Sequence, residues 1–284
     1  MKLSGIADEA GKTIEEQIEA HKKLGWELIE IRNVDSVNLT RTAEADFERI
    51  CAKLDEAGIR VSCFASEIAN WARKISGDFR IDADDLKNAI PRMKKLNAKF
   101  IRVMSYPNDG LDEGSWEKEA LKRLKELTRI AEDGDIILAH ENCSGWGGES
   151  PRQCLELVER IDSPCFRVLF DTGNPVCHGG DSWKFYSAVK PHIVYVHIKD
   201  AKKTPEGHTF TYPGEGDGCV REIIADLKKS GYDGVLSIEP HLKAIVHEGK
   251  EAHEGSDASA AYITYGEKLA RIVGETCPSE GARG

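Results

Sequence analysis

The segment Arg167–Ile198 has the sequence RVLFDTGNPVCHGGDSWKFYSAVKPHIVYVHI. Its first and last parts, Arg167–Asp171 and Ile193–Ile198, are short runs rich in β-branched and aromatic residues, which is typical of buried strands. The stretch between them is long enough for a helix, and Lys190-Pro191 makes the return to the second strand short. This order predicts two parallel strands joined by a crossover helix.

The same unit repeats along the chain. Six more strands are expected at Leu3–Ala7, Leu28–Arg32, Arg60–Ala65, Phe100–Ser105, Ile136–Glu141 and Val235–Glu239. The segments between them have helical periodicity, and 284 residues shared among eight units give about 35 residues per unit. This predicts an α/β fold of the (β/α)₈ TIM-barrel type, with eight parallel strands and outer helices. We expect one domain over residues 1–284, with a frayed tail after Gly274.

Local signals mark several helix ends. Thr13 and Glu16 fit a capping box, and Ser150-Pro151-Arg152-Gln153 combines a cap, a proline in the first turn and a capping partner. Pro91 is expected to kink the helix that contains it. Glycines follow three of the expected helix ends, at Gly25, Gly58 and Gly231.

Composition excludes several classes of function. The net charge of −10, from 49 acidic and 39 basic residues, opposes binding to nucleic acid or to an anionic membrane surface. No apolar run reaches the ~18 residues of a membrane span, and no signal-peptide pattern follows Met1. The eight cysteines contain no C-x-x-C pair, so we expect free thiols in a cytoplasmic protein rather than a disulfide framework or zinc ribbon.

Four consecutive strands end in a residue that can bind a metal ion: Glu141, Asp171, His197 and Glu239. Side chains alternate between the two faces of a strand. Because apolar residues such as Val168 and Phe170 occupy the outward positions, Asp171 is expected to point inward, and the same reasoning holds for the other three. The loops after the strands are long, and in a barrel they gather at the carboxyl end, where active sites lie.

Three carboxylates and one imidazole at one barrel end would repel each other without a compensating charge. A divalent cation supplies that charge, and oxygen ligands with one nitrogen suit Mn²⁺, Mg²⁺ or Co²⁺, with Zn²⁺ as a further option. The alternative is that each polar residue is paired structurally. We expect one divalent ion bound by Glu141, Asp171, His197 and Glu239.

This order of motifs resembles the xylose isomerase-like superfamily of sugar isomerases and epimerases, which includes ketose 3-epimerases, hydroxypyruvate isomerase, inosose dehydratase and endonuclease IV. The resemblance covers nearly the whole chain and is most specific at Glu141, Asp171, His197 and Glu239. It implies that these four residues bind the metal and that Glu141 and Glu239 act as acid and base on a small carbohydrate. A proton moved through an enediolate would give epimerisation or isomerisation, and loss of a β-hydroxyl would give elimination.

Two departures from the epimerase pattern raise a lyase or dehydratase alternative. Asn174 stands where many epimerases have histidine, and His197-Ile198-Lys199-Asp200 resembles inosose dehydratase instead. Endonuclease activity is disfavoured, because the second and third strands end in Arg32-Asn33 and Ala65-Ser66 rather than in the additional histidines of that enzyme. A binding module without catalysis is disfavoured, because four metal-ligand residue types stand in phase at the strand ends, and a homo-oligomer is left open.

Five residues near the strand ends are candidates for substrate binding: Arg32, Lys199, Asn174, His178 and Trp146. Arg32 could instead pair with Glu30 inside the barrel, Lys199 could pair with a carboxylate or serve in acid–base chemistry, and Trp146 could simply anchor its loop. His140 is expected to face outward and to make a structural hydrogen bond.

The remaining polar residues of the long loops give weaker signals. His241, His247 and His253 lack a tight metal-ligand spacing, so their roles stay open. The glycine-rich run Tyr212–Gly218 lacks the ending of a phosphate-binding loop and is expected to be the turn before a helix. No clear basic cluster is visible, although Lys199, Lys202, Lys203 and Lys243 are available. This favours a non-phosphorylated sugar.

Overall fold

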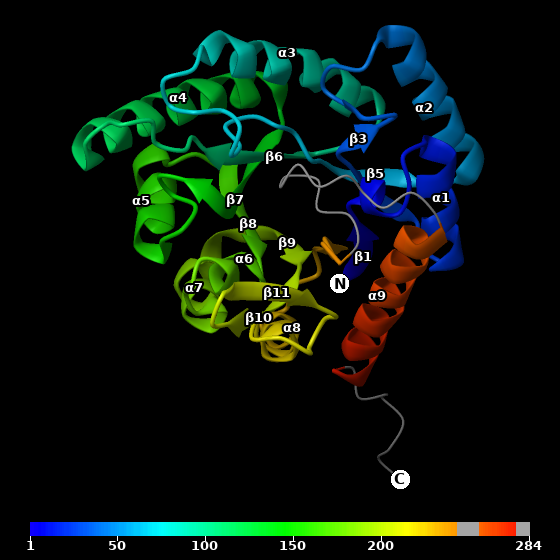
Figure 1. Ribbon diagram of the computed structural model, residues 1–284. Helices are drawn as coiled ribbons and strands as arrows, with labels where there is room; N and C mark the ends of the chain where they lie inside the picture. Colours follow the sequence, from blue (N-terminus) through cyan, green and yellow to red (C-terminus); the bar gives the residue numbers. More distant parts are fainter. Residues whose placement is uncertain (243–255, 277–284) are drawn as a thin grey trace.

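The computed structural model describes residues 1–242 and 256–276 and confirms the barrel. Eight parallel strands form one sheet in the order β1-β12-β9-β8-β7-β6-β5-β2, and a bridge between Ile6 and Glu30 links its two edges (Figure 1). The strands are β1 Lys2–Gly5, β2 Leu28–Ile31, β5 Arg60–Phe64, β6 Phe100–Ser105, β7 Ile137–Gly145, β8 Phe166–Asp171, β9 Ile193–Ile198 and β12 Val235–Ile238. All eight expected strands are therefore present, with small differences at their ends.

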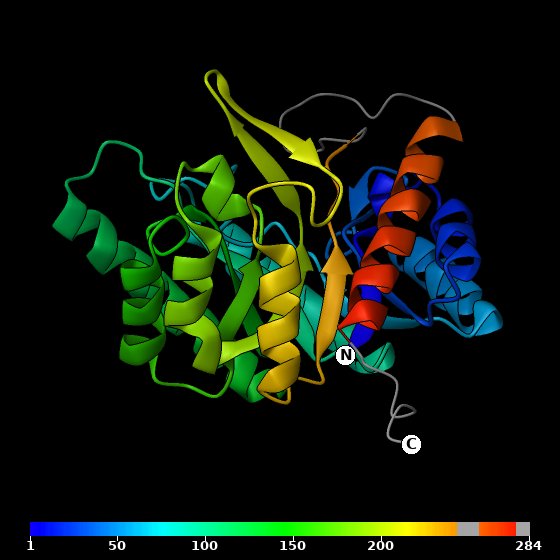
Figure 2. The ribbon, with the colours of Figure 1, turned by 90° about the horizontal axis from the view of Figure 1, so that it is seen from below.

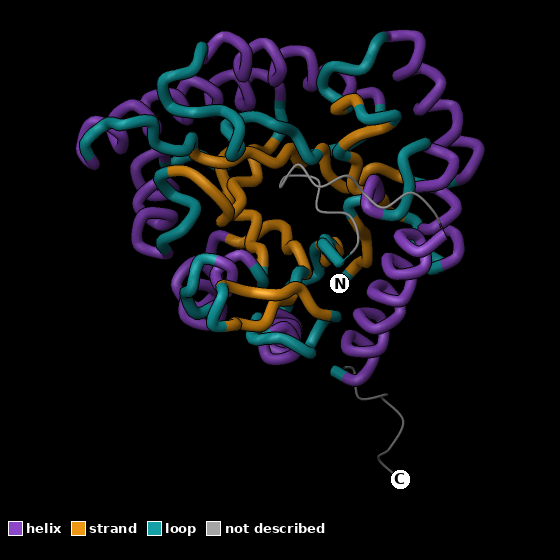
Figure 3. Tube along the Cα trace, in the orientation of Figure 1, coloured by secondary structure: helices purple, strands orange, loops and turns teal. Residues whose placement is uncertain are grey.

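Helices surround this ring of strands (Figure 3). They are α1 Ile14–Lys23, α2 Glu44–Ala57, α3 Phe79–Lys95, α4 Glu113–Gly134, α5 Pro151–Ile161, α6 Asn174–Cys177, α7 Ser182–Val189, α8 Val220–Lys229 and α9 Ser256–Glu275, with 3₁₀ turns η1 Ala7–Glu9 and η2 Lys190–His192. None of the described helices is long and apolar enough to cross a membrane. The predicted frayed tail falls mostly on residues 277–284, outside the described residues.

The helix-end signals are confirmed with one correction. Thr13 and Glu16 form the predicted capping box, and Gly25, Gly58 and Gly231 follow helix ends with positive φ. At α5, Ser150 is the N-cap and Pro151 stands in the first turn as predicted, but the hydrogen bonds of a capping box are absent: the Ser150 side chain makes no cap hydrogen bond, and the Gln153 side chain donates to Glu113 on α4. The chain also stays helical across Pro91.

Two antiparallel hairpins were absent from the sequence-based prediction. β3 Asn33–Val34 pairs with β4 Val37–Asn38, and β10 Asp200–Thr204 pairs with β11 Gly207–Thr211. The second hairpin projects beyond the carboxyl ends of the barrel strands (Figure 2). Most of the side chains of this hairpin are exposed or only partly buried, so its sequence lacks the apolar run from which a strand is predicted.

The barrel interior changes character along its axis. An inner apolar cluster fills one level of the barrel: Leu28, Cys63, Ala139, Leu169, Tyr195 and Val235. Two residues further along the strands most of the inward positions are polar, and Asp171 lies beside His197 in the register of β8 and β9. The apolar level closes the barrel below, so polar inward side chains collect at its carboxyl end.

One buried histidine links two outer helices to a barrel strand. His21 on α1 is fully buried, with Nδ1 2.7 Å from the carbonyl oxygen of Leu28 and Nε2 2.9 Å from the Tyr262 hydroxyl on α9. Since a carbonyl only accepts, Nδ1 donates and Nε2 accepts from the tyrosine. α9 packs closely here, because a Cβ added to Gly5 would lie 2.0 Å from the Tyr262 hydroxyl.

Burial lowers the pKa of His21 from 6.5 to about 4, which makes a pH-dependent contribution to stability. The unfolded chain takes up a proton at this side chain below its ordinary pKa, whereas the folded chain resists it. This contribution to stability is therefore present above pH 6.5 and is lost as the pH falls toward 4. Its size is about 3 kcal/mol.

In His21→Gln, chemical denaturation at a series of pH values should show a free energy of unfolding that falls less steeply over this range. The partly exposed His192→Gln serves as the control, and an unchanged slope in His21→Gln would contradict the assignment.

Candidate metal centre

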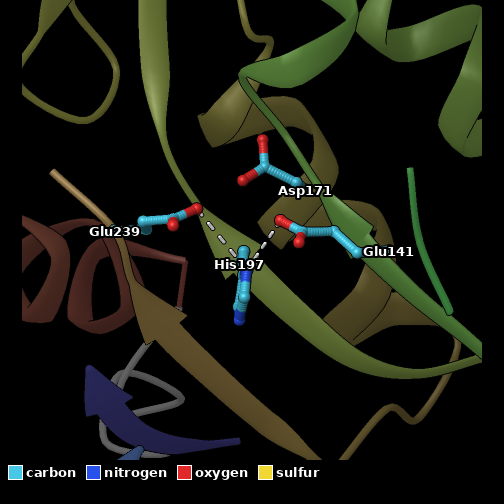
Figure 4. A group of neighbouring side chains, drawn as sticks. All are labelled: Glu141, Asp171, His197 and Glu239. Carbon is cyan, nitrogen blue, oxygen red and sulfur yellow. Dashed lines mark hydrogen bonds and ion pairs between the residues drawn. The ribbon is translucent and has the colours of Figure 1, made fainter. Parts of the chain in front are cut away.

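Four side chains from neighbouring strands meet at the carboxyl end of the barrel. Glu141 lies on β7, Asp171 ends β8, His197 lies on β9 and Glu239 follows β12. All four are at most 2% exposed, and one potential ligand atom from each lies within 4.8 Å of the others. His197 Nδ1 is 3.2 Å from Glu141 Oε1 and 3.7 Å from Glu239 Oε2 (Figure 4). The structure thus brings the four predicted residues together.

The carboxylates of this cluster have spare acceptor capacity. Within the described part of the chain, Glu141 Oε2, Asp171 Oδ2 and Glu239 Oε2 are buried and accept no hydrogen bond of good geometry. Buried carboxylate oxygens without hydrogen bonds are costly unless a cation lies among them. Three such oxygens and one imidazole nitrogen are a donor set that fits a single divalent ion.

Lys199 supplies part of the compensating charge. Its Nζ lies 2.7 Å from Glu239 Oε2 and 3.2 Å from Asp171 Oδ2, and it donates to the Asn174 side-chain oxygen at 3.0 Å. Burial alone would lower the pKa of Lys199, but the charges of Asp171 and Glu239 outweigh it and hold that pKa well above its usual range. The ion pair expected as one option for Lys199 is present, and the residue also lines the pocket described below.

His197 is held from behind by a second carboxylate. Its Nε2 lies 3.0 Å from both oxygens of Glu30, which also accepts a hydrogen bond from Ser237 at 2.6 Å. Burial lowers the pKa of His197, but Glu30 and Glu141 outweigh it and raise that pKa to about 10. This contact turns Nδ1 toward the carboxylates, the usual arrangement of a carboxylate behind a metal-binding histidine.

The Glu30–Arg32 pair considered from the sequence is wrong. Arg32 instead binds Asp8 through Nε and Nη2, at 3.0 and 2.9 Å, and reaches Glu239 Oε1 at 3.1 Å through Nη1. Glu30 on β2 and Arg32, which follows β2, are both buried as expected, but Glu30 contacts His197 and Arg32 contacts Glu239. The position of each residue along the strand predicted that its side chain points inward, but it did not predict that Glu30 pairs with His197 and Arg32 with Asp8.

A pocket opens beside the four-residue cluster. It is lined by Arg32, Asn33, Glu67, Asn70, Trp71, Arg102, Met104, Glu141, Cys143, Lys199 and Glu239. The loop between β5 and α3 contributes its outer wall, including Trp71, whose surface is 44% exposed. Sequence reasoning assigned no role to Arg102 or Trp71. The inward position of Arg102, between the apolar Ile101 and Val103, was a signal that could have found it.

The other candidate residues for substrate binding have different surroundings. Asn174 contacts the cluster directly, because its amide nitrogen lies 3.4 Å from Glu141 Oε1. Trp146 is only 2% exposed, and its indole N–H donates to Glu113 at 3.1 Å. This favours a loop anchor over a wall of the pocket. His178 is exposed, follows α6 and is not among the residues that line the pocket.

Two weaker sequence signals, His140 and His241, are resolved by the described residues. His140 points away from the barrel interior as expected, and its ring stacks on Phe166 at 5.5 Å while its Nδ1 forms a contact of 3.9 Å with Cys154 Sγ. His241 Nδ1 lies 2.8 Å from Glu9 Oε1 beside the Arg32 network, whereas His247, His253 and Lys243 lie outside the described residues.

The glycine-rich turn Tyr212–Gly218 wraps around a carboxylate of the protein itself. The backbone N–H groups of Gly214, Gly216 and Gly218 donate to Asp200 at 2.8, 3.0 and 2.9 Å. The loop therefore uses its donors internally, in agreement with the expected turn before a helix.

Comparison with known curated proteins identifies an epimerase and a dehydratase among the relatives. The 2-epi-5-epi-valiolone 7-phosphate 2-epimerase of an Actinoplanes species is 26% identical over 180 residues, which cover 63% of this chain and 64% of that protein. The inosose dehydratase of Bacillus anthracis is 25% identical over 142 residues, covering 45% of this chain and 47% of that protein. The chain therefore aligns with about half to two thirds of the length of these relatives.

Solved structures and a family model agree on the fold. The structure of the IOLI protein with a binding zinc atom superimposes with a TM-score of 0.75 at 18% identity, covering 98% of this chain and 99% of that one. The model for the xylose isomerase-like TIM barrel matches residues 18–264. This chain belongs to the xylose isomerase-like TIM barrel family.

Proposed function

We propose that this protein is a metal-dependent enzyme that isomerises or epimerises a sugar or keto-sugar. In this proposal Glu141, Asp171, His197 and Glu239 hold one divalent ion, for which Mn²⁺, Mg²⁺ and Co²⁺ are the best candidates and Zn²⁺ a further one. The observation that carries the proposal is the convergence of these four buried side chains, whose potential ligand atoms lie within 4.8 Å of one another beside an open pocket. The epimerase among the relatives supports it.

The bound ion would supply positive charge that stabilises negative charge developing on a carbonyl oxygen and its neighbouring hydroxyl. Glu141 and Glu239 approach the cluster from different strands, β7 and the end of β12 (Figure 4). One of them would remove the proton from the carbon between these two oxygens. The other would return a proton to the opposite face for epimerisation, or to the neighbouring carbon for isomerisation.

The charges around the two glutamates suit them to accept a proton. Burial raises the pKa of Glu141, but Arg102 and the contact with His197 outweigh it and lower that pKa to about 2. For Glu239, burial is outweighed by Lys199 and His241, which hold its pKa well below the usual range. Both carboxylates are therefore ionised at neutral pH, so either can act as the base, and the other would take up a proton from solvent through the pocket before it returns one to the substrate.

The pocket offers groups that could orient a sugar. Lys199 would contact a substrate oxygen next to the cluster, and Arg32 would do so beside Glu239, whereas Asn174, which is not among the residues that line the pocket, would act by holding Lys199 through its side-chain oxygen. Because Lys199 holds its proton tightly, its role would be to bind an oxygen rather than to donate a proton. Trp71 would cover an apolar face of the ring in the place first expected for Trp146, since aromatic side chains present a large apolar surface.

A lyase acting on a keto-sugar, keto-glycoside or inosose is the second candidate. The inosose dehydratase among the relatives favours it. The same carboxylate would remove the same proton, and a hydroxyl on the next carbon would then leave as water after receiving a proton. The two candidates share the site and differ in the product.

Solvent exchange tests this proposal directly. Protein loaded with Mn²⁺ should exchange a substrate C–H for deuterium in D₂O when it is offered a panel of ketoses, keto-glycosides and inososes. Exchange with retention of all oxygens indicates an isomerase or epimerase, and release of water indicates a lyase. Glu239→Gln should lower the exchange rate at least about 100-fold while circular dichroism stays unchanged, and the exposed Glu206→Gln should exchange normally. Activity of Glu239→Gln within about tenfold of wild type would disprove the acid–base role.

Glu30 provides a second test, because its charge would reach the ion only through His197. Glu30→Gln keeps the side-chain shape but removes the charge behind Nε2, and we expect the affinity for Mn²⁺ to fall about 10- to 100-fold. Calorimetric titration of metal-stripped protein measures this change. Asp82→Asn removes a buried carboxylate that does not line the pocket and should bind the ion as wild type does. An affinity of Glu30→Gln within about threefold of wild type would argue against this role.

A further inference from the structure

Arg102 is a buried cation in the pocket that the mechanism above does not use. It lies on β6, opposite Ala139 of β7, and its side chain is 6% exposed. It lines the pocket together with Glu141 and Glu239. A guanidinium inside a barrel loses its hydration and needs other partners.

The hydrogen bonds of Arg102 are incomplete. A guanidinium has five N–H donors, and the hydrogen bond found for Arg102 in the described structure is from Nη2 to the Ser66 carbonyl, at 3.3 Å. Its Nε is buried without an acceptor. Its Nη1 lies 3.5 Å from Glu141 Oε2 and 3.8 Å from Glu239 Oε1, which are ion pairs without a hydrogen bond.

Arg32 makes a useful comparison within the same pocket. Its Nε and Nη2 bind Asp8 at 3.0 and 2.9 Å, and its Nη1 donates to Glu239 at 3.1 Å. Arg32 is therefore held by a carboxylate of its own, whereas Arg102 shares two carboxylates that already face His197 and Lys199. Of the two arginines, Arg102 is therefore the one whose guanidinium N–H donors lack acceptors of good geometry.

From these contacts we propose that Arg102 binds a negatively charged oxygen group of the substrate, a carboxylate or a phosphate, so that the substrate is an anionic sugar derivative. The proposal rests on the proposed function, because a divalent ion shared by Glu141 and Glu239 would take up the charge of the two acids that face Arg102. The planar fork of a guanidinium matches two oxygens of a carboxylate or phosphate.

The other charged groups of the pocket are compatible with an anion. Glu67 on the outer wall would repel it, but Arg41 lies 2.7 Å and Arg73 3.8 Å from its Oε2. Lys199 adds a second buried cation next to the cluster. The net charge of −10 therefore does not describe the local field inside the pocket.

Three sugars that share one ring test this inference: glucose, glucuronate and glucose 6-phosphate. Their binding to Mn²⁺-loaded protein is measured by calorimetry, which needs no turnover. We expect at least one anion to bind about 10-fold or more tightly than glucose, and the preferred anion identifies carboxylate or phosphate as the group. Arg102→Met should abolish the preference and Arg102→Lys should retain part of it. Arg167→Met, at the opposite end of β8, should behave as wild type.

Two results would overturn the inference. The first is that neither anion binds the wild-type protein more tightly than glucose does. The second is that the preference for an anion persists in Arg102→Met, which would mean that the metal ion alone attracts the anion. Mn²⁺ binding is measured on the same preparations, and Arg102→Lys replaces Arg102→Met if the latter does not fold. A protein that binds no Mn²⁺ contradicts the proposed function, whereas one that binds Mn²⁺ but ignores sugar charge contradicts only the role of Arg102.

Discussion

Mutual repulsion among buried carboxylates is the constraint on which the rest of this site depends. Glu141, Asp171 and Glu239 are buried and bring ligand atoms within 4.8 Å of one another. At such a distance two like charges repel by about 3 kcal/mol with the effective dielectric constant that suits protein interiors. The barrel fixes this arrangement through the register of its parallel strands, so the side chains cannot simply move apart. Positive charge must therefore gather around them.

The surrounding residues divide this task among themselves. Lys199 lies against Asp171 and Glu239, Arg102 against Glu141 and Glu239, and Arg32 against Glu239 from the side of β2. His197 faces the same oxygens, with Glu30 behind it. The oxygens that face Lys199 and Arg102 make these ion pairs without a hydrogen bond of good geometry. The carboxylates stay ionised and keep coordination capacity, and both properties suit a centre that binds an ion and moves a proton.

Regular parts of the structure could be predicted from the sequence, because strands obey a simple rule. Alternation along each strand places Glu141, Asp171, His197 and Glu239 inward, and parallel strands bring their carboxyl ends to one side of the barrel. The same alternation predicted that Glu30 points inward but did not predict its contact with His197. Which inward side chains meet depends on their height along the barrel axis, which alternation does not give. Loop residues follow no regular alternation between faces. The sequence therefore could not predict that Trp71 lines the pocket, that Trp146 anchors its loop through Glu113, or that β10 and β11 form a hairpin.

The stoichiometry of metal binding tests the central claim most directly. Metal-stripped protein is dialysed against Mn²⁺, and the bound ion is counted per chain by elemental analysis. The account predicts about one ion per chain for wild type, and loss of that ion when the inward carboxylate of Asp171 is replaced in Asp171→Asn. A wild-type protein that retains no ion, or an Asp171→Asn protein that retains it fully, would contradict a metal centre built from these four residues.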